Sequence, residues 1–509
     1  MIQLTGESLN IDQVWDVAHK KTKVVLSESS KKLIQKSREY ILNKLKNNEA
    51  VYGVNTGFGA LSSVKISDQN LAELQKNLIR SHCCGIGDPF TKEESRAIML
   101  LRANALSRGH SGVRVEVVEK ILEFLNEDII PVIPQQGSVG ASGDLAPLSH
   151  LALALIGEGE VWQEGQVVPV AGLLKKKNIQ HLELQAKEGL SLINGCQVMT
   201  AVGLLSLYRA RRIAWIMDLA GAMSLEAMLG TRSAFDPLIS ATRAHPGEAI
   251  TARNLRKILG ETSPIAESHA NCSRVQDAYS LRCMPQVHGA TKDALRMGLK
   301  TLEIEANSST DNPLVFDKHD KILSCGNFHG EPVAFQLDFM GIAMAAMASI
   351  SECRIEKLIN PSMSGLPAFL TKDSGLNSGH MIVQVAAASL VSENKILAHP
   401  ASVDSIPTSA DKEDHVSMGT IAARKFGKIV DNAENVVAME LLSATQGLDL
   451  LSPLKPAGTI KSAYDVIRTK VPYADKDRIF AHDIKAIRGL ISDDSLIDVI
   501  QKTAGQLEF

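Results

Sequence analysis

Four long segments rich in small and flexible apolar residues constrain the fold of this chain more than any other feature. They cover residues 198–229, 334–359, 380–397 and 416–450, and each is rich in Ala, Met, Leu and Gly. Small side chains let the axes of long helices approach closely, as they do in helix bundles. Strand signals are sparse. We therefore expect a mainly all-α protein in which a globular N-terminal part precedes a long-helix bundle, with minor β structure.

Length and composition limit the functional classes. The chain has 509 residues and a formal net charge of −3, which argues against nucleic acid or an anionic membrane as the main partner. Residues 1–7 lack the features of a signal peptide, and the apolar stretch 339–350 is shorter than a membrane span. The seven cysteines include no CxxC pair, so we expect reduced thiols in a cytoplasmic protein.

The order of the segments predicts two domains. Residues 161–162 and 167–168 are expected to pair as a small hairpin around Glu164-Gly165, and the lysines 175–177 to be solvated surface. A helical regime begins near residues 192–197 and continues to about residue 455. We expect an N-terminal domain over residues 1–195 and a bundle domain with a C-terminal helical cap over residues 196–509.

The stretch 136–150 joins an extended apolar run to a segment with helical apolar spacing. Ser142 or Asp144 could simply be the N-cap of that helix, with glycines permitting the turn. A nucleotide-binding loop fits less well. The glycines at 137, 140 and 143 are spaced GxxGxxG rather than GxGxxG, and no phosphate-loop lysine follows.

Residues 140–150, Gly-Ala-Ser-Gly-Asp-Leu-Ala-Pro-Leu-Ser-His, resemble the signature of the aromatic amino acid ammonia-lyases. The resemblance covers essentially the whole chain, because motifs follow in the family's order at residues 52–59, 193–195, 279–282, 312–313 and 326–329. It implies a 4-methylidene-imidazol-5-one cofactor built by the protein from Ala141-Ser142-Gly143. The Gly143 nitrogen would attack the Ala141 carbonyl, and two waters would be lost, one of them with the Ser142 hydroxyl. N-terminal residues 1–195 would carry this cofactor.

Within the family, Ser81-His82 and residues 413–418 (Glu-Asp-His-Val-Ser-Met) resemble the members that act on histidine. The resemblance implies a carbon–nitrogen lyase that converts L-histidine to trans-urocanate and ammonia, the first step of histidine degradation. Asp411-Lys412 and Cys83-Cys84 depart from the family pattern. These departures leave the chemistry in place but bear on fine specificity.

The resemblance also implies roles for individual residues. Tyr52, on a glycine-rich loop, would be the base that removes a proton, and Arg282 would hold the substrate carboxylate with its planar fork. His82 and Glu413 would hold the imidazole. The implied catalytic positions are Tyr52, Ala141, Ser142, Gly143, Tyr279 and Glu413. The implied substrate-binding positions are His82, Asn194, Gln276, Arg282, Asn312 and Phe328.

Plainer structural interpretations remain open for several of these segments. The glycine-rich loop 51–59 could only turn a corner, and His82 could be a helix C-cap. Residues 399–415 form a loop of acids, hydroxyls and two histidines that could be a capped helix start. The polar loop 261–286 is unusually long for a compact domain unless it serves a site.

Other enzyme classes lack their signatures here. There is no HExxH motif and no Cys/His cluster at zinc spacing, so no metal is expected. GxSxG and the GSSxMPxKxN signature of the fumarase superfamily are also absent. The alternatives that stay open are a lyase or aminomutase acting on tyrosine or phenylalanine, and a binding protein with a dead site. The family assembly implies a homotetramer with shared active sites.

Overall fold

The computed structural model describes residues 1–46, 55–56, 66, 70–272 and 274–509, so Tyr52 and most of its glycine-rich loop lie outside the described residues. The chain forms two compact units. Unit 1 consists of residues 1–208, 298–338 and 400–424, and unit 2 of residues 209–297, 339–399 and 425–509. All of the expected N-terminal domain, residues 1–195, falls in unit 1, whereas residues 196–509 are divided between the two units.

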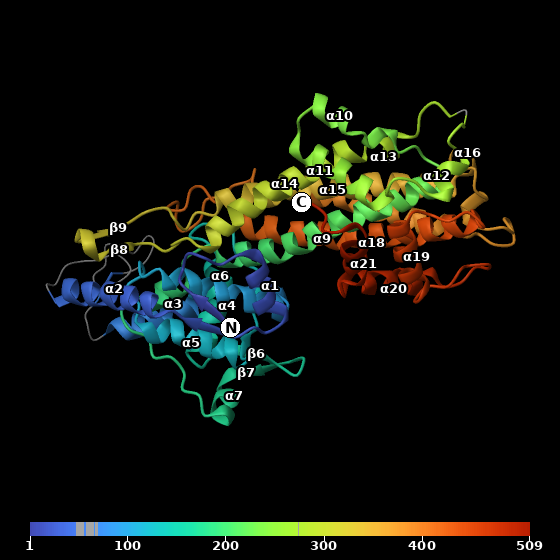
Figure 1. The fold of residues 1–509 in the computed structure, drawn as a ribbon. Helices are drawn as coiled ribbons and strands as arrows, with labels where there is room; N and C mark the ends of the chain where they lie inside the picture. The colour runs from blue at the N-terminus through green and yellow to red at the C-terminus, as the bar shows by residue number, and fades with distance from the viewer. Residues whose placement is uncertain (47–54, 57–65, 67–69, 273) are drawn as a thin grey trace. The chain divides into compact units, whose positions relative to one another are not determined.

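Unit 1 combines helices with short strands (Figure 1). Its elements are β1 Ile2–Leu4, α1 Ile11–His19, β2 Val24–Leu26, α2 Glu28–Lys46, α3 Leu71–His82, β3 Ile86–Pro89, α4 Lys92–Ser107, α5 Val115–Asn126, β4 Ile130–Pro131, β5 Pro134–Gln136, α6 Leu145–Leu155, β6 Glu160–Gln163, β7 Gln166–Pro169, α7 Val170–Lys177, α8 Glu188–Ile193, β8 Leu314–Phe316, η4 Asp317–His319 and β9 Lys321–Leu323. The core of this unit lies around α4, which is buried along nearly its whole length.

The strands of unit 1 form small separate sheets. β1 pairs with β2 in parallel, while β3–β5, β4–β6–β7 and β8–β9 are antiparallel. The expected hairpin is confirmed, because Val161 pairs with Val168 and Trp162 with Val167. The expectation of a mainly all-α fold with minor β structure is also confirmed.

Four long helices have residues in both units: α9 Gln197–Ala227, α14 Met284–Ala306, α15 Glu331–Ile359 and α18 Gly419–Leu450. The remaining elements of unit 2 are η3 Ser233–Phe235, α10 Pro237–Thr242, α11 Pro246–Leu259, α12 Pro264–Ser268, α13 Tyr279–Arg282, α16 Pro361–Ser364, η5 Ala368–Leu370, α17 Met381–Leu397, α19 Gly458–Arg468, α20 Phe480–Ser492 and α21 Ser495–Ala504. The bounds of α9, α15, α17 and α18 agree closely with the four helical segments expected from composition, and α14 was not among those segments.

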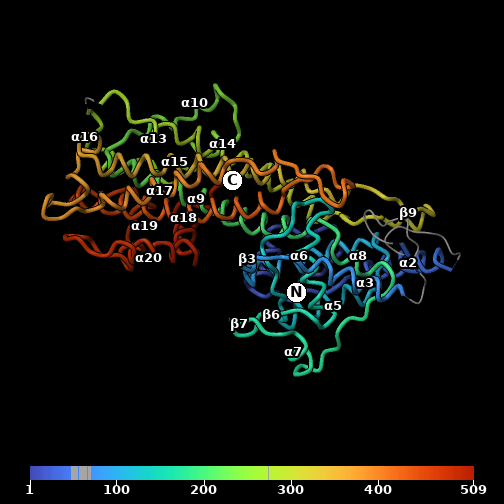
Figure 2. The backbone as a smooth tube through the Cα atoms, turned by 180° about the vertical axis from the view of Figure 1, so that it is seen from behind, coloured from blue at the N-terminus to red at the C-terminus, as the bar shows by residue number. Residues whose placement is uncertain are grey.

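Buried polar contacts tie the long helices of unit 2 together, and the helices run alongside one another in both backbone views (Figure 2). Arg354 on α15 forms a buried ion pair with Glu440 on α18, at 2.6 Å. The same carboxylate accepts a hydrogen bond from Ser224 on α9, at 2.7 Å. Burying an ion pair costs desolvation free energy, which is offset only when the remaining polar atoms of the pair are also hydrogen-bonded. Only one arrangement of the helix faces makes all of these bonds, so the contacts determine which faces meet.

α15 corrects one expectation from the sequence. It is long and apolar enough to cross a membrane by length and composition, whereas the apolar stretch was expected to be too short. Because 56% of its most apolar window is buried inside the protein, α15 is accounted for as a helix of the bundle core.

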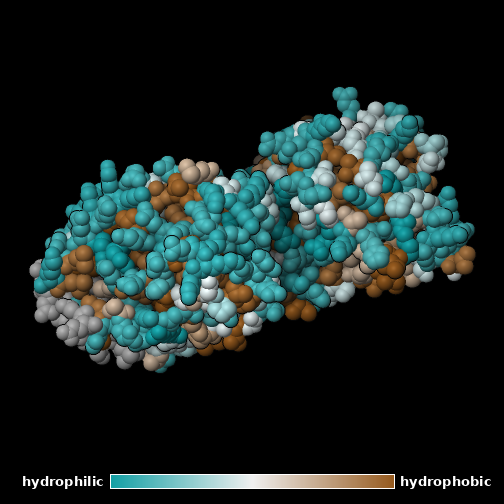
Figure 3. Space-filling model, turned by 90° about the horizontal axis from the view of Figure 1, so that it is seen from below, coloured by the Kyte–Doolittle hydropathy of each residue, from teal (hydrophilic) through white to brown (hydrophobic). Residues whose placement is uncertain are grey.

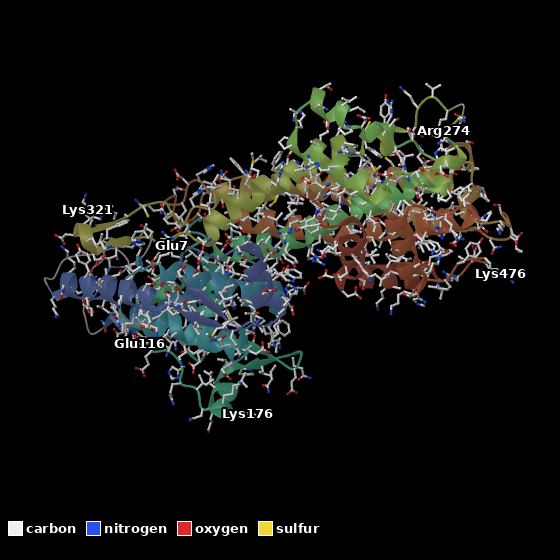
Figure 4. All side chains as sticks on the ribbon, viewed as in Figure 1. Glu7, Glu116, Lys176, Arg274, Lys321 and Lys476 are labelled. Carbon is white, nitrogen blue, oxygen red and sulfur yellow. The ribbon has the colours of Figure 1, made fainter. Side chains whose placement is uncertain are left out.

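On the face shown in Figure 3, hydrophilic residues predominate and hydrophobic residues form patches between them. Charged side chains project from the surface, such as Lys176 near the end of α7 and Lys321 on β9 (Figure 4). Lysines 175–177 are all exposed, which confirms that this run is solvated surface. The polar loop 261–286 is less continuous than expected, because the short helices α12 and α13 and the start of α14 interrupt it.

Candidate active site

The Ala141-Ser142-Gly143 tripeptide lies in a tight loop between β5 and α6. Gly140 and Gly143 have positive φ angles of +69° and +72°. A Cβ on Gly140 would lie 2.2 Å from the Ser417 hydroxyl oxygen, and one on Gly143 would lie 2.3 Å from the Gly195 carbonyl. Glycine is therefore required at both positions by backbone conformation and by space.

Asp144 holds this loop in place through hydrogen bonds to other segments. It is the N-cap of α6, but its carboxylate makes no cap bond to α6. It instead accepts hydrogen bonds from the backbone N–H groups of Val198 and Met199 at the start of α9, each at 3.0 Å. Ser138 and Thr420 donate to its other oxygen. Burial raises the pKa of Asp144, and these hydrogen bonds oppose the rise.

Glu413 faces the serine of the tripeptide. The Ser142 hydroxyl donates to Oε1 of Glu413 at 3.0 Å, and the Thr408 hydroxyl donates to Oε2 at 2.7 Å. Thr408 and Glu413 also exchange both backbone hydrogen bonds, so the loop folds back on itself and aims the carboxylate. Loop 399–415 therefore positions Glu413. It is not the first turn of a capped helix, because α18 begins beyond the loop, at Gly419.

His82 is the last residue of α3 and is half-buried. Its Nδ1 lies 2.8 Å from the Leu78 carbonyl oxygen, which can only accept, so Nδ1 carries the proton. Burial lowers the pKa of His82, while the Leu78 bond and the charge of Glu413 oppose that change. The neutral ring then presents Nε2 as an acceptor. His82 bonds to a carbonyl of the last turn of α3, as the plainer interpretation predicts, and no described residue bonds to its Nε2, which is left for a ligand.

Asn194 and Asn312 are brought together in a buried polar network. The Asn194 amide donates to the Asp311 carboxylate and to the Asn312 carbonyl, each at 3.2 Å. Burial alone would raise the pKa of Asp311, but the ammonium of Lys187 and the guanidinium of Arg102 hold it below its usual value. The Asn194 Oδ1 is buried and has no hydrogen-bond partner among the described residues.

Next to Phe328 lies a thiol–carboxyl pair that no local sequence pattern indicated. The buried Cys196 thiol donates to the Phe328 carbonyl at 3.0 Å. Burial raises the pKa of Cys196 well above its usual value and raises the pKa of the neighbouring Glu305 to about 7, to which the charge of Asp144 also contributes. Asp311 and Thr408 were missed as well. The partners of Asp311 lie on other segments and leave no local pattern, whereas Thr408 bonds to Glu413 within the same loop.

Unit 2 carries the remaining predicted residues. Gln276 and Tyr279 are exposed, and the Arg282 guanidinium lies over the Tyr279 ring at 4.6 Å from its centroid. Asp277 holds this segment, because its carboxylate accepts from the Thr231 N–H at 2.7 Å and from Arg274 at 3.2 Å. Arg274 is labelled in Figure 4. The Nε of Arg282 is buried and has no partner among the described residues.

The residues present fit the methylidene-imidazolone group that the sequence resemblance implies. The tripeptide is Ala-Ser-Gly with Gly143 in a conformation and space that only glycine occupies. The unpartnered Oδ1 of Asn194 offers a buried acceptor in the same unit. The helices α6, α9 and α18 all begin at Asp144 or at residues that bond to its carboxylate. The positive ends of the three helix dipoles therefore lie next to the tripeptide loop.

Comparison with known proteins gives one consistent family. The model of the aromatic amino acid lyases matches residues 9–469. Among curated relatives, a histidine ammonia-lyase of Myxococcus xanthus is 49% identical over 500 residues, with 98% of both chains covered. One of Alkaliphilus oremlandii is 48% identical over 502 residues, again with 98% of both chains covered.

Solved structures agree with these relatives. The crystal structure of histidine ammonia-lyase from Trypanosoma cruzi is similar with a TM-score of 0.92 at 42% identity, covering 99% of this chain and 95% of that one. A tyrosine aminomutase from Streptomyces globisporus is similar with a TM-score of 0.95 at 37% identity, covering 100% of both chains. The chain belongs to the aromatic amino acid lyase family.

Proposed function

We propose that this protein is an ammonia-lyase that eliminates ammonia from L-histidine to give trans-urocanate. The observation that carries the proposal is the Glu413 carboxylate, which lies 3.0 Å from the Ser142 hydroxyl of the Ala-Ser-Gly tripeptide. A carboxylate at this point pairs with an imidazole N–H but has nothing to bond on a phenyl ring. The names of the curated relatives support the same substrate.

The cofactor would form from the tripeptide by cyclisation and the loss of two water molecules. The Gly143 nitrogen bonds to the Ala141 carbonyl carbon, and that carbonyl oxygen leaves as water. A second water takes the Ser142 hydroxyl and the hydrogen on its Cα. The resulting 4-methylidene-imidazol-5-one supplies an electrophilic carbon that makes the substrate nitrogen a better leaving group.

The residues around Ser142 would orient the imidazole. Glu413 accepts from one ring N–H, and Nε2 of His82, whose Nδ1 proton is held by Leu78, accepts from another. Two acceptors suit an imidazolium, which carries two N–H donors, while a phenol offers a single O–H donor. Leaving the Glu413 carboxylate desolvated beside a phenyl ring would cost several kcal/mol, on the order of 2–5.

The other predicted residues complete the site in this proposal. Arg282 holds the substrate carboxylate with two parallel N–H bonds, and Gln276 assists it. Asn194 and Asn312 orient the cofactor, while Phe328 and Tyr279 exclude water. Tyr52 removes the Cβ proton and remains a prediction from sequence.

Assembly and location are part of the proposal. Exposed apolar side chains on the long helices of unit 2, Phe339, Ile342, Ile382, Val385 and Ile396, need a cover. A homotetramer that shares active sites between subunits would supply it, and would bring partner chains to the exposed Gln276 and Tyr279. We place the enzyme in the cytoplasm, with no nucleic acid or membrane partner.

The alternative function is a tyrosine-specific lyase or aminomutase. It is favoured by the similarity to the tyrosine aminomutase structure, whose backbone is as close as that of the histidine enzyme. Backbone similarity at this level reports the shared fold and chemistry, whereas substrate choice depends on His82 and Glu413.

Substrate assays distinguish the two functions. The purified protein is incubated separately with histidine, tyrosine and phenylalanine, and each conjugated product is followed by its ultraviolet absorbance. We expect rapid formation of urocanate and little product from the other two. Preferential turnover of tyrosine, or formation of a β-amino acid, would overturn the assignment to histidine.

A further inference from the structure

A second group of ligating side chains lies outside the proposed chemistry. His329 follows Phe328 in the turn before α15, Glu331 is the first residue of α15, and His415 lies in the loop before α18. One potential metal-ligand atom from each of the three side chains lies within 4.8 Å of the other two. All three belong to unit 1. Because His329 and His415 are 86 residues apart, no sequence spacing could reveal the group.

The hydrogen bonds of His329 determine which ring nitrogen carries the lone pair. Its Nε2 lies 3.2 Å from the backbone carbonyl of His415, so Nε2 carries the proton. The lone pair on Nδ1 then points toward Glu331, whose Oε2 is 4.0 Å away and whose backbone N–H donates a long bond of 3.3 Å. Metal-binding histidines use this arrangement, in which one nitrogen donates to a carbonyl and the other ligates.

Glu331 contributes an acceptor oxygen close to this ring nitrogen. Its Oε2 is buried and has no hydrogen-bond partner among the described residues. Oε2 of Glu331 lies 4.0 Å from Nδ1 of His329, which accepts only the long bond of 3.3 Å from the Glu331 N–H. A cation bound to both atoms gives Oε2 its missing partner and replaces that long bond.

The ring of His415 supplies the third ligand. It stacks on His329 with ring centroids 5.7 Å apart and an angle of 4° between the planes. His415 is exposed, so a ring nitrogen can turn toward the other two ligands and solvent can fill a fourth position. Tetrahedral metal–ligand bonds of about 2.0–2.2 Å require the side chains to close by roughly 1 Å.

We propose that His329, Glu331 and His415 bind one divalent transition-metal ion of the zinc class. Two imidazoles with one carboxylate are a donor set that zinc and cobalt prefer, whereas magnesium and calcium prefer oxygen ligands. The ion would join the turn that holds Phe328 to the loop that holds Glu413. Its role is to fix two walls of the site, and it takes no part in bond breaking.

Cobalt titration tests the proposal directly, because Co²⁺ in a site with nitrogen ligands absorbs visible light. The full-length protein, stripped with a chelator and dialysed, is titrated with CoCl₂ and then with ZnCl₂. We expect absorption that saturates at one ion per chain and disappears when zinc is added. The measurement is independent of lyase activity, so its failure would leave the proposed function intact.

Variants assign the ligands. His329→Gln and His415→Gln should each weaken cobalt binding at least tenfold, and Glu331→Gln should weaken it by a smaller factor. His319→Gln, at an exposed histidine on η4, is the matched control and should bind as the native protein does. Circular dichroism of the metal-free proteins checks that each variant is folded.

Two results would overturn the metal site. The first is native protein that shows no saturable cobalt absorption. The second is binding that the ligand variants and the His319→Gln control affect equally.

Discussion

The two loops that meet at Ser142 are held in different ways. The tripeptide loop is pinned from several sides, with Gly143 against Gly195 and the Asp144 carboxylate bonded to the start of α9 and to Thr420. The loop that carries Glu413 is mostly exposed, and its carboxylate is aimed by one hydroxyl, that of Thr408.

The difference in how the two loops are held matches their proposed roles, which are cofactor formation for the tripeptide loop and substrate recognition for the loop that carries Glu413. Cyclisation of a tripeptide needs its nitrogen and carbonyl held in one geometry, and a buried loop with many contacts provides that. Substrate choice needs only a carboxylate or another group at the right position on the facing loop. Relatives that act on different amino acids can therefore share one fold while the facing loop differs.

The largest effect is expected for the tripeptide itself. Native protein should be lighter than its sequence by two water molecules, located in the peptide that contains residues 141–143. Ser142→Ala has no hydroxyl to lose as the second water, so it should form no methylidene group and lose histidine turnover by on the order of 10³-fold or more. Intact-mass and peptide mass spectrometry measure the loss of water. Native protein with its full sequence mass would refute the cofactor.

The second-largest effect is expected when the Asp144 carboxylate, which holds the tripeptide loop in place, is replaced. Asp144→Asn places an amide NH₂ or a single carbonyl where the carboxylate accepts four hydrogen bonds. We expect a loss of about 3 kcal/mol in unfolding free energy and incomplete loss of water from the tripeptide. Thermal unfolding and intact mass measure both. Asp88→Asn, at an exposed position on β3, is the control and should match native protein in each measurement.

Glu413→Gln should damage recognition and leave the cofactor unchanged. The amide keeps the shape of the side chain but loses the charge that pairs with the imidazole. We expect kcat/KM for histidine to fall by about 10²–10³-fold, the scale of a lost acid–base or charge-pairing group, with the two-water mass loss retained. Asp414→Asn, next to it and exposed, should be close to native. Near-native turnover by Glu413→Gln would refute the assignment of histidine.

Much of the fold could be predicted because it depends on local patterns. Long runs of Ala, Met and Leu predicted α9, α15, α17 and α18 to within a few residues, and Glu164-Gly165 predicted the hairpin. The assembly of unit 1 from three separate segments could not be predicted. It depends on contacts between distant parts of the chain, for which one sequence carries no periodic signal.

The candidate site was only partly predictable for the same reason. The family motif selected Ser142 and Glu413, which the structure brings within hydrogen-bond distance. Ser142 or Asp144 was a candidate N-cap of α6, and Asp144 holds that position. Its carboxylate bonds instead to α9 and α18, whose first turns lie far along the sequence. Glu305 was not selected at all, because its raised pKa arises from burial near Cys196 and Asp144, which only the folded chain creates.

A smaller effect is expected at the hydroxyl that aims Glu413. Thr408→Val removes the bond of 2.7 Å to Oε2 while keeping the size of the side chain. A hydrogen bond to a charged group contributes about 1.5 kcal/mol, so kcat/KM for histidine should fall roughly tenfold. Thr408→Ser keeps the hydroxyl and should retain most of the activity. Equal activities for the valine and serine variants would show that the hydroxyl does not aim the carboxylate.

The smallest effect concerns the protonation of His82. Because burial lowers its folded-state pKa below the usual value of 6.5, the unfolded chain binds this proton more readily than the folded chain does. The stability linked to neutral His82 is therefore fully present above pH 6.5 and is lost as pH falls through the lowered pKa. His82→Gln lacks this titration, so the difference in melting temperature between native protein and variant should shrink from pH 7.5 to pH 5. Measuring unfolding without substrate avoids the titration of histidine itself. A difference that stays constant would mean that burial does not lower the pKa of His82 in the folded protein. A difference that grows at low pH would mean that His82 is charged there and donates to Glu413 from Nε2. His82 could then not accept from the substrate, and Glu413 alone would recognise the imidazole, so the pair of acceptors proposed for the ring would be refuted.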